Sequence, residues 1–174
     1  MVPANYKSYD GGVVRNPDRR GYFGIGVYRS KNKENIGTLW RSAFVFGASF
    51  IFTIGRRYNY QCSDTVKAWR SIPLYNYENT DTFYRHMPKD CRLIGVEIVE
   101  GAININNFVH PERTIYLLGA EDSGLPQKML NMCHGIVVLP GKHCLNVATV
   151  GSIIMFDRIT KNGTNDNLHL PMGV

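Results

Sequence analysis

The feature that most constrains the fold is a regular alternation between short apolar runs and segments with helical spacing. Runs rich in β-branched and aromatic residues predict strands at 22–28, 49–55, 72–75, 92–98, 113–119 and 135–139. Apolar residues spaced three or four positions apart predict helices at about 35–47, 63–70, 79–86, 127–132 and 146–159. Strands that alternate with helices predict an α/β fold, with a mostly parallel sheet flanked by helices.

Length and charge narrow the class of protein. The chain has 174 residues, which suits one domain, and 44% hydrophobic residues, which suffice for a sizeable core. Lys and Arg number 20 against 14 Asp and Glu, a formal net charge of +6. An excess of this size favours a polyanionic partner such as nucleic acid, although solubility alone also explains it.

The cysteines and the amino terminus are the features from which a cellular compartment can be inferred. Cys62, Cys91, Cys133 and Cys144 form no CxxC pair and show no zinc-ligand spacing, although His143 adjoins Cys144. We expect reduced thiols and no metal, as is typical of a cytoplasmic protein. The start of the chain lacks an apolar signal segment, and no apolar run is long enough to span a membrane.

Residues 1–21 are polar and carry Arg15, Arg19 and Arg20 close together. We expect a basic, flexible arm preceding a domain at 22–174. The arm is either a disordered terminus or a tail that contacts phosphates.

Three blocks at the ends of apolar runs, 35–47, 117–126 and 139–148, combine glycine or proline with polar side chains. In an open α/β sheet, loops at strand ends are where ligands bind. In the first block we expect Asn35 to cap its helix. Arg41 lies six positions later on an otherwise apolar helix and suits phosphate recognition, with a surface salt bridge as the alternative.

The second and third blocks follow predicted strands. Gly119 and Gly124 permit a tight loop that presents the Glu121 carboxylate, unless this is an ordinary turn. In the third block, Asn146 can both donate and accept hydrogen bonds. Cys144 is either a nucleophile beside His143 or a small packed thiol.

Together the blocks resemble the SpoU/TrmH-type RNA methyltransferases of the SPOUT superfamily. The first block matches the family motif N-x-G-x-x-x-R-x-A-x-x-F-G, and the second matches G-x-E-x-x-G-L. The third resembles S-L-N-V-S/A. The matching positions are Asn35, Gly37, Arg41, Ala43, Phe46 and Gly47, then Gly119, Glu121, Gly124 and Leu125, then Leu145, Asn146, Val147 and Ala148.

This resemblance implies a carboxyl-terminal trefoil knot, a homodimer, and S-adenosylmethionine as the cofactor. The expected reaction is methyl transfer to a ribose 2′-hydroxyl of tRNA or rRNA. By position, the resemblance implies cofactor contacts at Val96, Gly119, Leu139, Cys144 and Leu145.

The resemblance also assigns roles near the reacting hydroxyl. It assigns to Arg41 the removal of the proton from the ribose hydroxyl. Because a guanidinium stays protonated, we expect Arg41 instead to bind the RNA phosphate and orient the hydroxyl. Asn35 is expected to hold Arg41 or the ribose, Glu121 to orient Arg41 or backbone groups, and Asn146 to fix the loop. Cys144 stands where the family usually has serine, and a thiol is a weaker hydrogen-bond donor.

A chain of this length leaves no room for a separate RNA-binding domain of ordinary size. We therefore expect RNA contacts from basic residues of the domain and the arm, although each could equally be a solvated surface charge. The candidates are Arg15, Arg19, Arg20, Arg29, Lys31, Lys33, Arg56 and Arg57. A non-catalytic RNA-binding module of the same fold and a base-methylating enzyme remain alternatives, and the sequence leaves the choice between tRNA and rRNA open.

Overall fold

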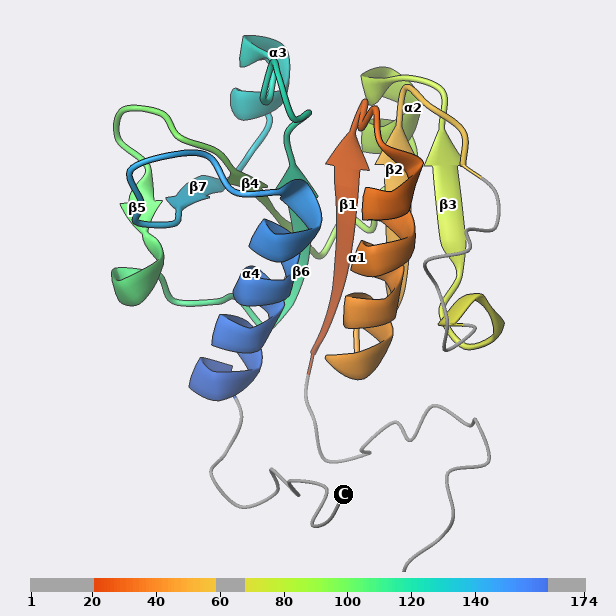
Figure 1. Cartoon of the computed structure of the whole chain (residues 1–174), viewed down its shortest axis with the longest axis horizontal. Coiled ribbons are helices and arrows are strands. Elements are labelled where there is room, and N and C mark those ends of the chain that lie inside the picture. Colours follow the sequence, from red (N-terminus) through yellow and green to blue (C-terminus); the bar gives the residue numbers. More distant parts are fainter. Residues whose placement is uncertain (1–20, 59–67, 163–174) are drawn as a thin grey trace, which may run out of the picture.

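The computed structural model describes residues 21–58 and 68–162 (Figure 1). Within them, one seven-stranded sheet has the order β3-β2-β1-β6-β4-β7-β5, and every strand pair is parallel. The strands are β1 (Tyr22–Tyr28), β2 (Phe50–Ile54), β3 (Leu74–Tyr77), β4 (Arg92–Val96), β5 (Ile103–Asn104), β6 (Arg113–Leu118) and β7 (Gly135–Val138). The helices are α1 (Lys33–Val45), α2 (Thr80–His86), α3 (Gln127–Leu130) and α4 (Val147–Asn162), with 3-10 turns η1 (Ala68–Arg70) and η2 (Ile105–Asn107).

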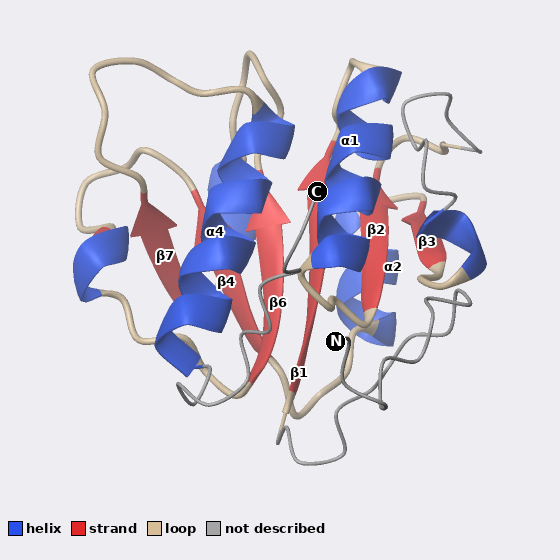
Figure 2. Cartoon of the chain, turned by 60° about the horizontal axis from the view of Figure 1, so that its bottom comes forward, coloured by secondary structure: helices blue, strands red, loops and turns tan. Residues whose placement is uncertain are grey.

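Helices cover both faces of the sheet (Figure 2). Helices α1 and α4 lie side by side on one face, and α2 lies on the other. Alternate residues of β6 serve the two faces: Tyr116 and Leu118 join the core under α1 and α4, whereas Ile115 and Leu117 join the core under α2. A sheet buried on both faces explains why its strands read as continuous apolar runs.

The expected α/β fold with a parallel sheet is confirmed, and most elements lie where the spacing placed them. Strand β1 has the predicted bounds, whereas the strand predicted at 92–98 ends at Val96. Strand β5 was missed because two residues carry no periodic signal. The helix predicted at 63–70 falls mainly outside the described residues, which contain only η1 of it.

The prediction that Asn35 caps the first helix is wrong. The cap is Asn32, whose side chain accepts a hydrogen bond of 2.8 Å from the backbone N–H of Glu34. Asn35 lies inside the first turn of α1, and 7% of it is exposed. Its side chain is therefore available for contacts across the fold.

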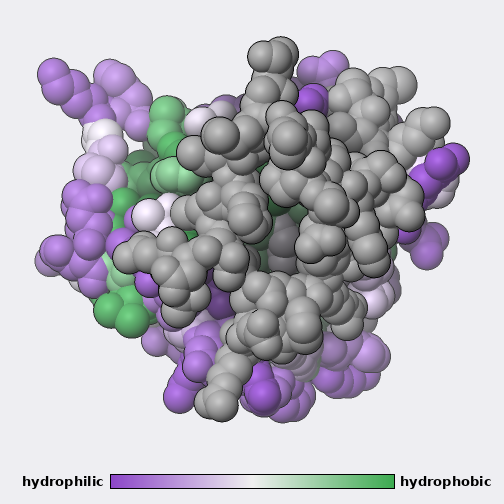
Figure 3. Space-filling model, turned by 90° about the horizontal axis from the view of Figure 1, so that it is seen from below, coloured by the Kyte–Doolittle hydropathy of each residue, from purple (hydrophilic) through white to green (hydrophobic). Residues whose placement is uncertain are grey.

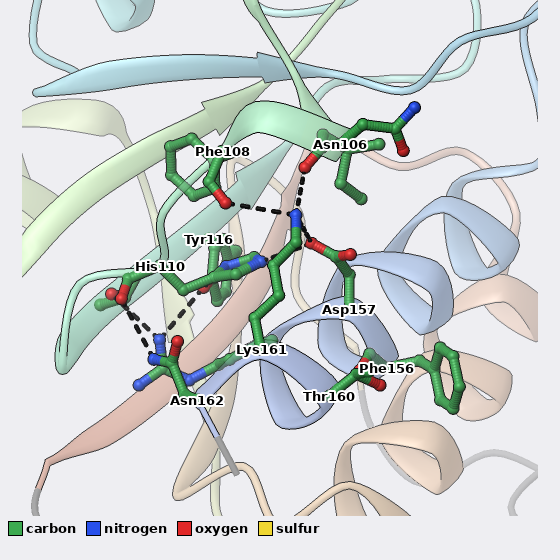
Figure 4. A network of polar contacts seen from close by, with 12 residues as sticks. Asn106, Phe108, His110, Tyr116, Phe156, Asp157, Thr160, Lys161 and Asn162 are labelled. Carbon is green, nitrogen blue, oxygen red and sulfur yellow. Dashed lines mark hydrogen bonds and ion pairs between the residues drawn. The ribbon is translucent and has the colours of Figure 1, made fainter. Parts of the chain in front are cut away.

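A buried polar network holds the carboxyl-terminal half of α4 against the sheet (Figure 4). His110 lies between the Tyr116 hydroxyl, 2.6 Å from Nδ1, and Asp157 Oδ2, 2.7 Å from Nε2. The carboxylate can only accept, so Nε2 carries the proton and Nδ1 accepts from the tyrosine. Arg158 adds donors to the carbonyls of Pro111 and Glu112, each at 2.6 Å.

Seen from the end at which the strands begin, the periphery is mainly hydrophilic, and hydrophobic residues gather on one side (Figure 3). In the described part of the chain, no helix combines the length and hydropathy needed to cross a membrane.

Close packing between α4 and the sheet favours glycine at position 151. A Cβ there would lie 2.4 Å from Leu39 Cδ1, 3.1 Å from Leu118 Cδ1 and 3.3 Å from Ile25 Cδ1. All three neighbours are buried. The glycine thus lets α4 approach α1 and the sheet directly.

We predict that Gly151→Ala lowers the free energy of unfolding by about 1 kcal/mol, because overpacking outweighs the gain in helix propensity. Urea denaturation monitored by circular dichroism measures the change. A more stable variant would show that Leu39 repacks without cost.

We further predict that stability falls as the pH drops below 6.5. Burial lowers the pKa of His110 from its ordinary 6.5, against the opposing effect of Asp157. The unfolded chain therefore takes up a proton that the folded chain resists, and the loss begins near pH 6.5 and continues down to the lowered pKa. Urea titrations between pH 7.5 and 5 should give a smaller pH dependence for His110→Gln than for the native chain, and equal slopes would contradict this assignment.

Candidate functional site

A cavity of about 370 Å³ opens at the carboxyl ends of the central strands. Its walls come from the ends of β4, β6 and β7, the loops that follow them, and the first turn of α4. The lining residues are Val96, Glu97, Ile98, Leu118, Gly119, Ala120, Glu121, Asp122, Gly124, Val138, Leu139, Pro140, Gly141, His143, Cys144, Leu145, Asn146, Val147 and Val150. The size and the mixture of apolar walls with a few polar groups are typical of a small-molecule site.

All five residues expected to contact a cofactor line this cavity. Val96 and Gly119 lie at the ends of β4 and β6, while Leu139, Cys144 and Leu145 belong to the loop between β7 and α4. Cys144 and Leu145 are exposed in that loop. The structure thus gathers residues that are up to 49 positions apart, from 96 to 145, around one hollow.

Glu97 also lines the cavity, and the sequence analysis did not single it out. Its Oε2 accepts a hydrogen bond of 2.7 Å from the N–H of Leu125, and its Oε1 accepts one of 2.9 Å from Ile98 N. A Cβ on Gly119 would lie 2.7 Å from the carbonyl carbon of Gly124, and Gly124 has a φ of 59° with Oε2 only 2.4 Å from where its Cβ would be, so glycine is favoured at both. The sequence signal for Glu97 was an acidic residue near the end of the strand predicted at 92–98.

Side chains from the three sequence blocks meet beside the cavity. Asn35 Nδ2 donates to Glu121 Oε1 at 2.7 Å, and Asn146 Nδ2 donates to Asn35 Oδ1 at 2.9 Å. Asn146 Oδ1 in turn accepts from the N–H of Ala148 at 2.9 Å, at the start of α4. One hydrogen-bond chain therefore links β6, α1 and α4.

The direction of the bonds in this chain follows from its two ends. Ionised Glu121 can only accept, so Asn35 turns its NH₂ group toward it and its oxygen toward Asn146. The N–H groups of Ala148 and Thr149 can only donate, so Asn146 turns its oxygen toward α4 and its NH₂ group toward Asn35. The carboxylate and the start of α4 thus require the same two amide orientations.

The surroundings keep Glu121 ionised. Partial burial raises the pKa of its carboxyl group, but hydrogen bonds from Ser30, from its own backbone, from Asn35 and from Lys31 outweigh that effect. The net pKa lies below the ordinary value of 4.5. The negative charge therefore persists at neutral pH.

Arg41 is exposed on α1 and is not among the residues that line the cavity. Asn35, which we expect to hold Arg41 or the ribose, forms hydrogen bonds with Glu121 and Asn146.

Several basic residues follow β1 and β2 at the same edge of the sheet. Arg29, Arg56 and Arg57 are exposed, and Arg29 lies over the Tyr28 ring at 5.5 Å. Lys31 pairs with Asp122, and Lys33 is exposed in the first turn of α1. Arg15, Arg19 and Arg20 fall outside the described residues.

The next feature is the arrangement of residues that could bind a metal ion. Within residues 21–58 and 68–162, no group of three or more His, Cys, Asp or Glu residues is arranged to hold a metal ion. Cys91, Cys133 and Cys144 are free thiols.

A parallel sheet with a cavity at its strand ends defines an α/β protein with a ligand site at the carboxyl edge. Residues 23–156 match the model of the SpoU rRNA Methylase family. That match covers most of the chain, which therefore belongs to this family. No curated protein matches the chain.

Solved structures share the fold. An AdoMet-bound rRNA methyltransferase from Sinorhizobium meliloti superposes with a TM-score of 0.73 and 21% identity, over 81% of this chain and 57% of that protein. The SpoU methyltransferase AviRb from Streptomyces viridochromogenes gives 0.73 and 21%, over 84% and 62%. A TrmH/SpoU tRNA modifying enzyme from A. aeolicus gives 0.72 and 14%, over 82% and 76%. The chain thus spans about three fifths of the first two proteins.

We predict that Asn35→Asp destabilises the fold by about 2 kcal/mol at pH 7, because it replaces a donor to Glu121 with a second carboxylate. The penalty should shrink as the pH falls and the two carboxylates share a proton. Urea denaturation at pH 7 and pH 5 measures both effects.

Asn32→Asp is the matched control. An aspartate accepts from the Glu34 N–H as well as asparagine does, and its charge is favourable at a helix start. Equal destabilisation by the two variants would show that the Asn35–Glu121 bond does not matter.

Proposed function

We propose that the protein is an S-adenosylmethionine-dependent RNA methyltransferase that methylates a ribose 2′-hydroxyl of tRNA or rRNA. The observation that carries this proposal is the hydrogen-bond chain from Glu121 through Asn35 to Asn146. It joins one residue from each of the three family blocks at the rim of the strand-end cavity.

The cavity fits the cofactor in size and chemistry. Val96 and Leu139 offer apolar walls, while Gly119 and the loop around Cys144 and Leu145 present backbone groups. Gly119 and Gly124 leave room for the Glu97 carboxylate in the cavity wall. We propose that the carboxyl-terminal segment forms the trefoil knot implied by the resemblance, with the loop from Leu139 to Leu145 around the cofactor.

The cofactor, when bound, supplies an electrophilic methyl group on a sulfonium sulfur. The chain's own residues must bring the RNA hydroxyl into line with it, and such positioning supplies much of the rate acceleration. Arg41 binds the RNA phosphate and orients the hydroxyl, and its guanidinium does not accept the proton. Asn35, Glu121 and Asn146 hold the rim of the site in one arrangement.

We propose a homodimer in which Arg41 serves the site of the partner subunit. Arg41 does not line the cavity of its own chain. Helices α1 and α4 expose apolar side chains beside one another, namely Val45, Ile153 and Phe156, with exposed fractions of 65%, 37% and 57%. Covering these side chains with a second copy would bury them and complete the site.

RNA contacts are proposed for the carboxyl edge of β1 and β2, through Arg29, Arg56 and Arg57. We also propose RNA contacts from Arg15, Arg19 and Arg20 in the arm at 1–21, which precedes the domain at 22–174. Free thiols in the described residues accord with the cytoplasm as the compartment.

We predict that Arg41→Ala abolishes methyl transfer while cofactor binding is retained, because Arg41 lies outside the cavity. Calorimetric titration with S-adenosylmethionine measures binding. Transfer of a tritiated methyl group to unmodified tRNA and rRNA transcripts measures activity, and nuclease digestion identifies the methylated nucleoside.

Arg92→Ala is the control, since Arg92 is an exposed arginine at the start of β4, at the opposite end of the sheet. It should leave both measurements unchanged. A native protein that neither binds the cofactor nor methylates any transcript would point to a non-catalytic module, and a methylated base would overturn the ribose assignment.

A further inference from the structure

Two buried hydroxyl groups outside the three family blocks support the Glu121 carboxylate, Ser30 by direct contact and Tyr58 through the Ser30 backbone. Ser30 is 1% exposed and Tyr58 is 3% exposed. We infer that Ser30 and Tyr58 are positioning residues that hold Glu121, and through it the Asn35–Asn146 pair, in the arrangement that methyl transfer needs. The link to transfer rests on the proposed function, whereas the link to Glu121 does not.

Ser30 and the residue after it clamp both carboxylate oxygens. Ser30 Oγ donates to Glu121 Oε1 at 2.8 Å, and the N–H of Lys31 donates to Oε2 at 3.2 Å. Asn35 donates to the same Oε1 at 2.7 Å. The carboxylate is thus held from two sides, and hydrogen bonds to a charged group are among the stronger ones.

Tyr58 holds the backbone that carries this clamp. Its hydroxyl donates to the carbonyl oxygen of Ser30. Its own N–H donates to Asn76 Oδ1 at 3.0 Å, and Asn76 Oδ1 also accepts from the Thr53 hydroxyl at 2.8 Å. Tyr58 therefore ties the turn after β1 to the ends of β2 and β3.

The turn itself needs such support. Arg29, directly before Ser30, has a φ of 49°, a left-handed conformation that is costly for a residue with a side chain. The N–H of Arg29 donates to the carbonyl of Ile54 at 2.9 Å. This conformation turns the chain so that the Ser30 hydroxyl and the Lys31 N–H both reach Glu121.

The first measurement is the titration of Glu121 in the full-length protein, followed by NMR of the ¹³C-labelled glutamate carboxyl groups. Ser30→Ala removes one hydrogen bond to the charged form, so the pKa of Glu121 should rise toward its ordinary value. Tyr58→Phe keeps the ring and should move the pKa in the same direction, because the Ser30 backbone is released.

The second measurement is the pH dependence of methyl transfer to the same unmodified transcripts. Both variants should lower the turnover number by about tenfold with little change in the KM for S-adenosylmethionine. The acid limb of the rate profile should move to higher pH along with Glu121. A side chain with a merely structural role would change stability without moving this limb.

Ser152→Ala is the matched control. It removes a partly buried hydroxyl that lies 2.8 Å from Ser42 Oγ, seven positions after Asn35 on α1, and it should change neither the titration nor the rate. An unchanged Glu121 titration in both Ser30→Ala and Tyr58→Phe would overturn the inference. A shifted titration with an unchanged rate would overturn the link to transfer. If the native chain transfers no methyl group, the proposed function fails, and the titration still decides whether Ser30 and Tyr58 hold Glu121.

Discussion

The arrangement of the site depends on one ionised carboxylate. Glu121 can only accept hydrogen bonds, so Asn35 turns its NH₂ group toward the carboxylate. Asn146 donates to the Asn35 oxygen, and its own oxygen accepts from the N–H of Ala148 at the start of α4. At the other end, the backbone N–H groups of Ala148 and Thr149 can only donate, so they hold the Asn146 oxygen toward α4. The two amides are thus oriented from both ends, and the donors around Glu121 keep its pKa low.

Helix α4 connects this ordered site to a second polar centre. Its first turn lines the cavity and is capped by Asn146, while its last turns are held by Arg158 and by the His110–Asp157 pair. Between these ends, Gly151 allows direct contact with α1 and the sheet. The helix is thus fixed at both ends and along its length, so the cavity wall that it provides is rigid.

Much of the fold could be predicted from local pattern, and much of the site could not. Continuous apolar runs predicted the parallel strands, and the three blocks pointed to Asn35, Glu121 and Asn146. The cap at Asn32 was missed because two asparagines stood near the same helix start, and only the contact with Glu34 separates them. Ser30, Tyr58 and Glu97 act through partners 91, 28 and 28 positions away, and no local pattern encodes such pairs.

The bond between Asn35 and Asn146 spans 111 positions of the chain, which has a consequence for the time order of folding. Contacts between distant residues form late, because loop closure must come before any stabilisation they provide. During synthesis, the residues of β1 to β6 are made before the segment with β7 and α4, which completes the cavity, has left the ribosome. The strand-end cavity is therefore completed only in the step that docks α4.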